Sequence, residues 1–133
     1  GNEVIMANAA TLAGHVEIAD RANIGAYSGV HQFCRIGLEA FVGGYSVVVK
    51  DAPPFAVIQG NHAKCFGLNR VGMRRRGYAA DTIQKLNHAF HLLLSAKLNT
   101  TQAVERIKHE ITGCAEVEIL VDFIESSKRG VVK

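Results

Sequence analysis

The chain has 133 residues, which is long enough to bury the core of one domain. Its 48% hydrophobic and 20% charged residues exclude a disordered chain, and a net charge of +3 is too small for a nucleic-acid-binding tail. No apolar run is long enough to span a bilayer. Because Cys34, Cys65 and Cys114 show no C-x-x-C spacing, we expect free thiols in a reducing, cytoplasmic compartment.

The first fifty residues repeat with a period of six. Every sixth residue from Met6 to Val48 is aliphatic, and the residue two places before each of them is small or β-branched. A fixed period is the signature of a solenoid, in which each short strand points an aliphatic side chain inward and small residues let the chain bend. We predict a mainly β chain of triangular coils, whose strands pair in parallel between coils. Ordinary buried strands are the alternative.

The repeat fades after Asp51, where two prolines begin a loop. We expect one further strand over residues 56–59. Apolar residues at helical spacing then predict a helix over residues 81–97, and Asn99 is placed to cap a second helix that ends at Gly113.

A third predicted helix starts near Val117 and stops near Gly130. The sequence therefore divides into coils at 1–59, a loop with substrate-contacting residues at 60–77 and a helical region at 78–133. We expect the helices to cover the open edge of the last coil.

Six motifs, in this order and spacing, resemble one enzyme family. They are ATLAGHVEI, VHQFCRIG, VGGYSVV, DAPPFAVIQGNHA, FGLN and RRRGY. The family is that of the acyl-carrier-protein-dependent UDP-N-acetylglucosamine O-acyltransferases, which make the first committed step of lipid A synthesis in Gram-negative bacteria. The resemblance covers the whole chain. It implies a left-handed parallel β-helix and a homotrimer with active sites between subunits.

The resemblance also implies the partners of the reaction. A 3-hydroxyacyl group on acyl carrier protein would be transferred to the 3-hydroxyl of UDP-N-acetylglucosamine, with no cofactor, metal or nucleic acid. The general-base histidine of the family lies in the coil just before a Gly-Asn pair, and Gly1 and Asn2 begin this sequence. We therefore expect the C-terminal half of such an enzyme, inactive alone but still trimeric.

The resemblance assigns the acyl-transfer site to two neighbouring coils. The attacking hydroxyl needs a base and the tetrahedral intermediate needs N–H donors. Gly14 would donate its N–H to the oxyanion and His15 would lie against the sugar, while His31 and Gln32 would bind substrate. His31 follows His15 after almost three repeats, which is close to one full coil, so both histidines should lie near one edge. A hydrogen-bonded histidine at a subunit interface is the alternative for His31.

Two further positions resemble the acyl-chain groove of the family. Gly44 would leave the groove open and His62 would lie at its far end. Tyr45 is bulkier than expected beside Gly44, so the acyl-chain length stays open. A tight corner and a buried, hydrogen-bonded histidine are the alternatives for these two residues.

The basic cluster Arg74–Arg76 resembles a nucleotide-binding segment. Asn69 would lie beside the nucleotide, and Arg75 and Arg76 would contact the UDP phosphates or the acidic carrier protein, because arginine suits bidentate phosphate contacts. A solvated charge run is the alternative, and nucleic acid is disfavoured by the absence of interleaved aromatic residues. His88 and His91 are one helical turn apart, but two ligands do not make a metal site, so we expect exposed histidines.

Three other functions compete with this one. A sister acyltransferase that N-acylates the next lipid A intermediate shares the repeats and the donor, but its C-terminal tail differs. A γ-type carbonic anhydrase would hold zinc between subunits through three ligands, and its characteristic His-x4-His pair is absent here. A trimeric solenoid without chemistry is the third.

Overall fold

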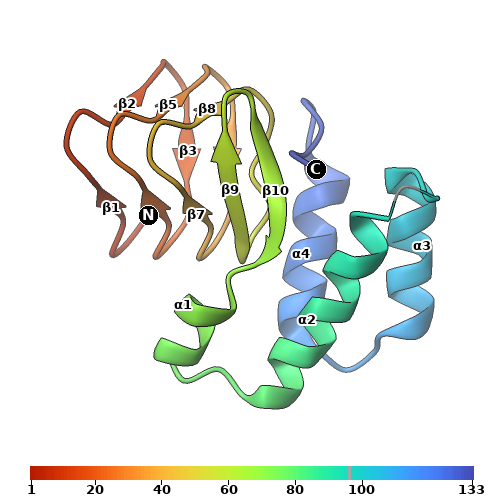
Figure 1. Cartoon of the computed structure of the whole chain (residues 1–133). Helices are drawn as coiled ribbons and strands as arrows, with labels where there is room; N and C mark the ends of the chain where they lie inside the picture. The colour runs from red at the N-terminus through yellow and green to blue at the C-terminus, as the bar shows by residue number, and fades with distance from the viewer. Residues whose placement is uncertain (96) are drawn as a thin grey trace.

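The computed structural model describes residues 1–95 and 97–133, and within them the chain forms ten strands and four helices (Figure 1). The first eight strands are very short and recur at the period of the sequence repeat. They are β1 (Ile5–Met6), β2 (Thr11–Leu12), β3 (Glu17–Ile18), β4 (Asn23–Ile24), β5 (Gly29–Val30), β6 (Arg35–Ile36), β7 (Phe41–Val42) and β8 (Val47–Val48).

These strands form the three faces of a triangular β-solenoid. Strands β1, β4 and β7 pair in parallel on the first face, β2, β5 and β8 on the second, and β3 and β6 on the third. Met6 pairs with Ile24 and Ile24 pairs with Val42, so one coil consists of three whole repeats. The predicted solenoid, with three strands per coil and parallel pairing between coils, is confirmed.

The solenoid interior is filled from two positions of every repeat. The aliphatic position is buried from Ile24 onward, as predicted, and the small residue two places earlier is buried with it, as at Ala22 and Cys34. In the first coil Met6 and Leu12 stay 42% and 37% exposed, because a neighbouring coil in the described chain covers them on one side only.

The corners between strands repeat one backbone conformation. His15, Tyr27 and Phe33 are among nine non-glycine residues of the described ranges with φ between 56° and 65°. This left-handed conformation costs an L-residue about 1–2 kcal/mol, which the backbone hydrogen bonds between coils offset. Residues at one corner position lie directly above one another, and Tyr27 stacks on Tyr45 with ring centroids 5.2 Å apart.

The segment 60–77 is not the predicted loop. β9 (Ala56–Gly60) joins the first face in parallel with β7, and β10 (Ala63–Leu68) runs antiparallel to β9. A short helix, α1 (Arg70–Arg75), follows, and the Asn69 side chain accepts a hydrogen bond from the Gly72 N–H at 3.1 Å. The Gly60-Asn61 pair is a hairpin turn signal, and Asn69 is a helix cap signal that sequence reasoning did not use.

The helical tail follows the predicted pattern. α2 (Ala80–Leu93), α3 (Thr100–Glu110) and α4 (Ala115–Ser126) each bury one apolar face. α2 ends before the predicted boundary, and residue 96 of that prediction lies outside the described residues. Asn99 caps α3, and Gln102 completes a capping box with it. No helix in the described ranges is both long and apolar enough for a membrane crossing.

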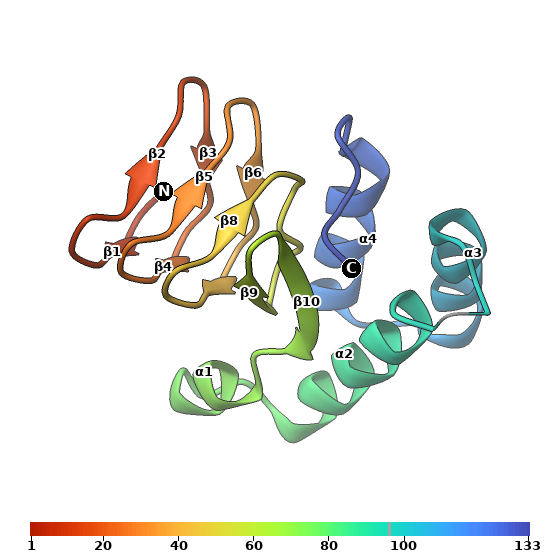
Figure 2. The ribbon, with the colours of Figure 1, turned by 45° about the horizontal axis from the view of Figure 1, so that its top comes forward.

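The tail is fastened to the last coil through Asp51. Its backbone N–H donates to the Gly130 carbonyl and its carbonyl accepts from Val132, while its buried carboxylate accepts from the Arg35 N–H and the Ser127 hydroxyl at 2.8 and 2.6 Å. Figure 2 shows α4 and the C-terminal segment beside the last coil. The prediction that the helices cover the end of the solenoid is confirmed.

Close contact between coils predicts a position-specific cost of added volume. A Cβ at Gly37 would lie 2.4 Å from the Pro54 backbone nitrogen, whereas a Cβ at Gly29 would meet its nearest atom, the Thr11 hydroxyl oxygen, at 3.6 Å. Gly37→Ala should therefore lower the free energy of unfolding by about 2 kcal/mol or more, and Gly29→Ala by less than about 1 kcal/mol. Urea unfolding of both variants measures this. Equal transition midpoints would contradict the packing argument.

Candidate functional site

A groove of about 470 Å³ lies between the first face of the solenoid and α1. Asn23, Phe41 and Val57 stand at paired positions of β4, β7 and β9 and line one side of it. Asn69 and the predicted phosphate-binding arginines line the other side. Parallel pairing thus brings together residues that are far apart in sequence.

Asn69, Arg75 and Arg76 all border this groove, as a common role requires. The Asn69 oxygen caps α1, so its amide NH₂ is the part left to donate outward. Arg75 is exposed and forms no ion pair with the described residues. Arg76 directly follows α1 and is engaged by carboxylates of the solenoid.

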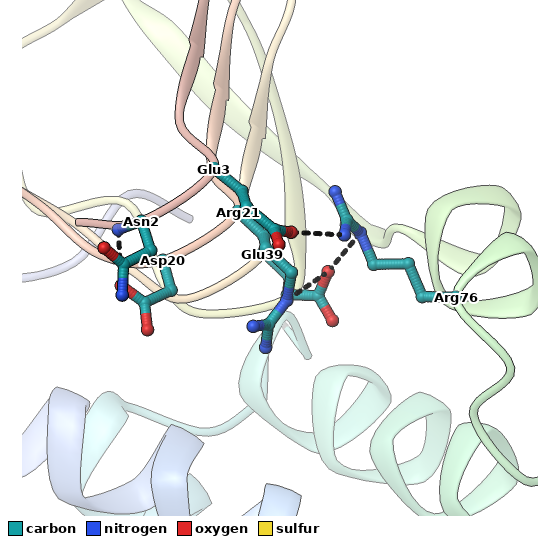
Figure 3. A network of polar contacts seen from close by, with 6 residues as sticks. All are labelled: Asn2, Glu3, Asp20, Arg21, Glu39 and Arg76. Atoms are coloured by element: carbon teal, nitrogen blue, oxygen red, sulfur yellow. Dashed lines mark hydrogen bonds and ion pairs between the residues drawn. The ribbon is translucent and has the colours of Figure 1, made fainter.

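A ladder of charged corner residues receives Arg76 (Figure 3). Glu3, Arg21 and Glu39 occupy the same corner of three successive coils, each with φ near 57°. Arg76 Nε lies 2.7 Å from Glu39 Oε1, and its Nη1 lies 3.5 Å from Glu3 Oε2. Arg21 Nε is 3.4 Å from the same Glu39 oxygen. Sequence reasoning missed Arg21 and Glu39, although their spacing of one full coil was a usable signal.

Tyr78 completes the ion cluster on the side of the helical tail. Hydrogen bonding to Tyr78, with the charge of Glu39 adding to it, raises the pKa of the Arg21 guanidinium above its ordinary value. Burial, and after it the Glu39 carboxylate, raises the pKa of Tyr78. Arg21 therefore stays charged and Tyr78 stays neutral throughout the physiological pH range.

A second group of predicted residues lies at the corner between the second and third faces. His15 and His31 come from this corner on successive coils, which confirms their predicted proximity to one edge. His15 stacks on Phe33, not on His31, with ring centroids 5.0 Å apart and planes within 2°. Because one coil is three whole repeats, Phe33 is the position above His15, and sequence reasoning missed it.

The backbone around Gly14 is open. A Cβ at Gly14 would meet no atom within 4 Å, so internal packing does not require glycine there. His31 and Gln32 are exposed beside it. A hollow of about 670 Å³ extends from this corner toward the C-terminal segment. Its lining carries charges of both signs and consists of His15, Glu17, Phe33, Arg35, Asp51, Ser126, Lys128 and Arg129.

Gly44 and His62 lie at the remaining corner. The Gly60 N–H donates to the Ser46 hydroxyl at 3.1 Å, which places the β9–β10 turn next to the corner that holds Gly44. A Cβ at Gly44 would lie 3.3 Å from the Ala26 carbonyl oxygen. His62 is exposed, so the alternative of a buried histidine is wrong, and Tyr45 is 73% exposed in its stack with Tyr27.

The histidines and cysteines outside these groups behave as ordinary side chains. His88 and His91 are exposed on α2, and His88 Nε2 lies 3.3 Å from Glu110 Oε1. Among the described residues no three His, Cys, Asp or Glu side chains are placed to share a metal ion. All three cysteines are free thiols, as predicted, and burial raises the pKa of Cys65.

Comparison with known proteins identifies relatives along the whole chain. A family described as UDP N-acetylglucosamine O-acyltransferase, domain 2, matches residues 51–132. The acyl-[acyl-carrier-protein]–UDP-N-acetylglucosamine O-acyltransferase of Aliivibrio salmonicida is 44% identical over 133 residues, which is all of this chain and 51% of that protein. The corresponding enzyme of Burkholderia orbicola is 44% identical over 137 residues, or 52% of its length.

Solved structures agree with this match. LpxA from Acinetobacter baumannii superimposes with a TM-score of 0.94 at 42% identity, covering 98% of this chain and 51% of that one. LpxA from Bacteroides fragilis gives 0.97 at 34% identity, covering 100% and 52%. These similarities confirm the expected left-handed β-helix. The chain spans about half the length of the relatives it matches, and this half is the C-terminal one, as expected.

The stack of His15 on Phe33 gives a spectroscopic prediction. A ring lying parallel over an imidazole shields its carbon-bound protons, so Phe33→Ala should move the His15 resonances downfield and leave those of the other five histidines in place. Proton NMR of wild type and variant measures this. Tyr45→Ala removes a stacked ring from a different corner and is the matched control. Unchanged His15 resonances in Phe33→Ala would show that the rings do not stack in solution.

Proposed function

The chain belongs to the UDP-N-acetylglucosamine O-acyltransferase family, and from this we propose that the protein transfers a 3-hydroxyacyl group from acyl carrier protein to the 3-hydroxyl of UDP-N-acetylglucosamine. This would be the first step of lipid A biosynthesis, carried out in the cytoplasm. The observation that carries the proposal is the convergence of Asn69, Arg75 and Arg76 on one groove.

The groove suits the diphosphate of a sugar nucleotide. Arg75 is free of ion pairs with the described residues, so its planar guanidinium can take two phosphate oxygens at once. Arg76 stands next to it, and the Asn69 amide can donate to the nucleotide. We assign these three residues to nucleotide binding.

The corner of Gly14 suits the acyl-transfer step. The sugar oxygen would form a bond to the thioester carbon while its proton passes to a base. The C–S bond would then break, and the base would return the proton to the departing sulfur to give the carrier thiol. We assign the Gly14 N–H to the oxyanion, because no atom outside its chain neighbours lies within 4 Å of the position that a Gly14 Cβ would occupy, so a ligand can approach the backbone there. We assign His15 to contact with the sugar, and His31 and Gln32 to substrate binding. These roles need neither cofactor nor metal.

The separation of these groups supports a homotrimer. The groove of Arg75 lies on the first face, whereas the corner of Gly14 joins the second and third faces. One nucleotide can reach both groups most simply if a second subunit supplies one of them. We propose that Gly44 and His62, at the third corner, border the path of the acyl chain. Light scattering of the protein at micromolar concentration tests the trimer.

The direct test is an assay of the protein at its full natural length. Purified protein should form the O-acylated sugar nucleotide and free carrier thiol from UDP-N-acetylglucosamine and 3-hydroxyacyl carrier protein. Acylation only of an amino sugar nucleotide would identify the sister N-acyltransferase. Bound zinc together with carbon dioxide hydration would identify the carbonic anhydrase, and no turnover of any of these would leave a non-catalytic solenoid.

Removal of the free arginine should weaken nucleotide binding. Because a charged hydrogen bond contributes about 1.5–3 kcal/mol, Arg75→Ala should raise the Kd for UDP-N-acetylglucosamine roughly tenfold or more. Calorimetry at low and high salt measures this, and Arg106→Ala, whose arginine is paired with Glu110 on α3, is the control. A variant with slower carrier-protein association but normal nucleotide affinity would reassign Arg75 to carrier docking. No change in either would make it a solvated charge.

A further inference from the structure

Glu39 is a buried carboxylate at the edge of the nucleotide groove. Its side chain is only 4% exposed, and removing such a charge from water costs several kcal/mol unless partners compensate for it. Its two ion-pair partners, the Nε atoms of Arg21 and Arg76, contact the same oxygen, Oε1. Within the described chain Oε2 has no hydrogen-bond partner. This arrangement is a poor way to stabilise a fold, so its geometry calls for another explanation.

The geometry fixes the direction of the Arg76 guanidinium. Glu39 holds its Nε at 2.7 Å and Glu3 approaches its Nη1 at 3.5 Å (Figure 3). The ion pairs and hydrogen bonds of the described residues do not engage Nη2. Arg76 is therefore restrained at Nε and Nη1, while its Nη2 stays available to a ligand. Glu39 itself is fixed, because it is buried and belongs to a corner of the solenoid.

A restrained arginine binds an anion at lower entropic cost than a free one. An arginine side chain loses rotamer entropy when it is immobilised. If Glu39 removes that freedom before the ligand arrives, the cost does not fall on binding. The cluster remains attractive to an anion, since Arg21, Arg75 and Arg76 outnumber Glu3 and Glu39, and all but Glu3 line the same groove.

We propose that Glu39 is a positioning residue for the diphosphate of the sugar nucleotide, acting through Arg76. The inference rests on the proposed function and extends it to a residue that never touches the substrate. Glu39 holds the Arg76 guanidinium at Nε. The Nη2 side of the guanidinium then contacts the phosphate beside Arg75. A purely structural Glu39 would instead only fasten the end of α1 to the solenoid.

A double-mutant cycle separates these two roles. UDP is titrated calorimetrically into the protein at its full natural length, as wild type, Glu39→Gln, Arg76→Ala and the double variant. Glu39→Gln keeps the size of the side chain and removes its charge. We expect it to weaken UDP binding about fivefold in the wild-type background, because part of the restraint on Arg76 is lost. In the Arg76→Ala background it should have no further effect.

Controls keep the result interpretable. Glu125→Gln, in an exposed pair with Lys108 on the helical tail, should leave UDP affinity unchanged. Thermal unfolding reports any loss of stability separately. If Glu39→Gln does not fold, Arg76→Lys carries the test, because lysine keeps the charge at an exposed site but lacks the Nε that Glu39 holds. We expect about fivefold weaker UDP binding for it as well.

Two outcomes overturn the positioning role alone. One is wild-type UDP affinity in Glu39→Gln, or in Arg76→Lys where that variant carries the test. The other is an equal loss of affinity on Glu39→Gln with and without Arg76, which would mean that Glu39 does not act through Arg76. Wild-type protein that fails to bind UDP or to turn over UDP-N-acetylglucosamine would instead overturn the proposed function, and the positioning role with it.

Discussion

The structure depends on one constraint, the register of the backbone hydrogen bonds between coils. The N–H groups of Ile5, Thr11 and Gly29 donate to carbonyls of the next coil at 2.8–3.0 Å, and the other strands repeat this pattern. Because parallel pairing fixes the register, every residue lies above the residue one coil earlier. Glycine at positions 25 and 37 follows from this, since a Cβ at either would collide with the backbone of a neighbouring coil.

The same register builds the candidate site. The register fixes which residue of the next coil lies beside a corner side chain. Functional side chains on the solenoid therefore form ladders of stacked residues along each edge. His15 with Phe33 forms one ladder, and the sequence of Glu3, Arg21 and Glu39 forms another. Each ladder is held by backbone hydrogen bonds and a buried aliphatic column, which gives the rigidity that a binding site on a corner requires.

The sequence could predict the features that follow directly from the repeat period and from helix-capping residues. The six-residue period predicted the coils, and Asn99 predicted the start of α3. Handedness came only from the resemblance, because the spacing of a repeat is the same for either hand. The hairpin of β9 and β10 was missed although its pairing is local, because the turn signal of Gly60 and Asn61 was not used. The stack of His15 on Phe33 was missed because His31 lies just short of one full coil from His15, whereas the register selects the residue three whole repeats away.

The adjacent arginines show why composition alone could not assign the site. In the sequence, Arg75 and Arg76 are equivalent members of a basic run. Of the two, only Arg76 contacts a buried carboxylate in the described structure. That difference comes from position, because Arg76 lies at the end of α1, opposite the third rung of a charged ladder. The groove thus contains one arginine with a fixed orientation, Arg76, beside one that can still reorient, Arg75. In the positioning role proposed for Glu39, the cost of burying its carboxylate is offset by a gain in binding.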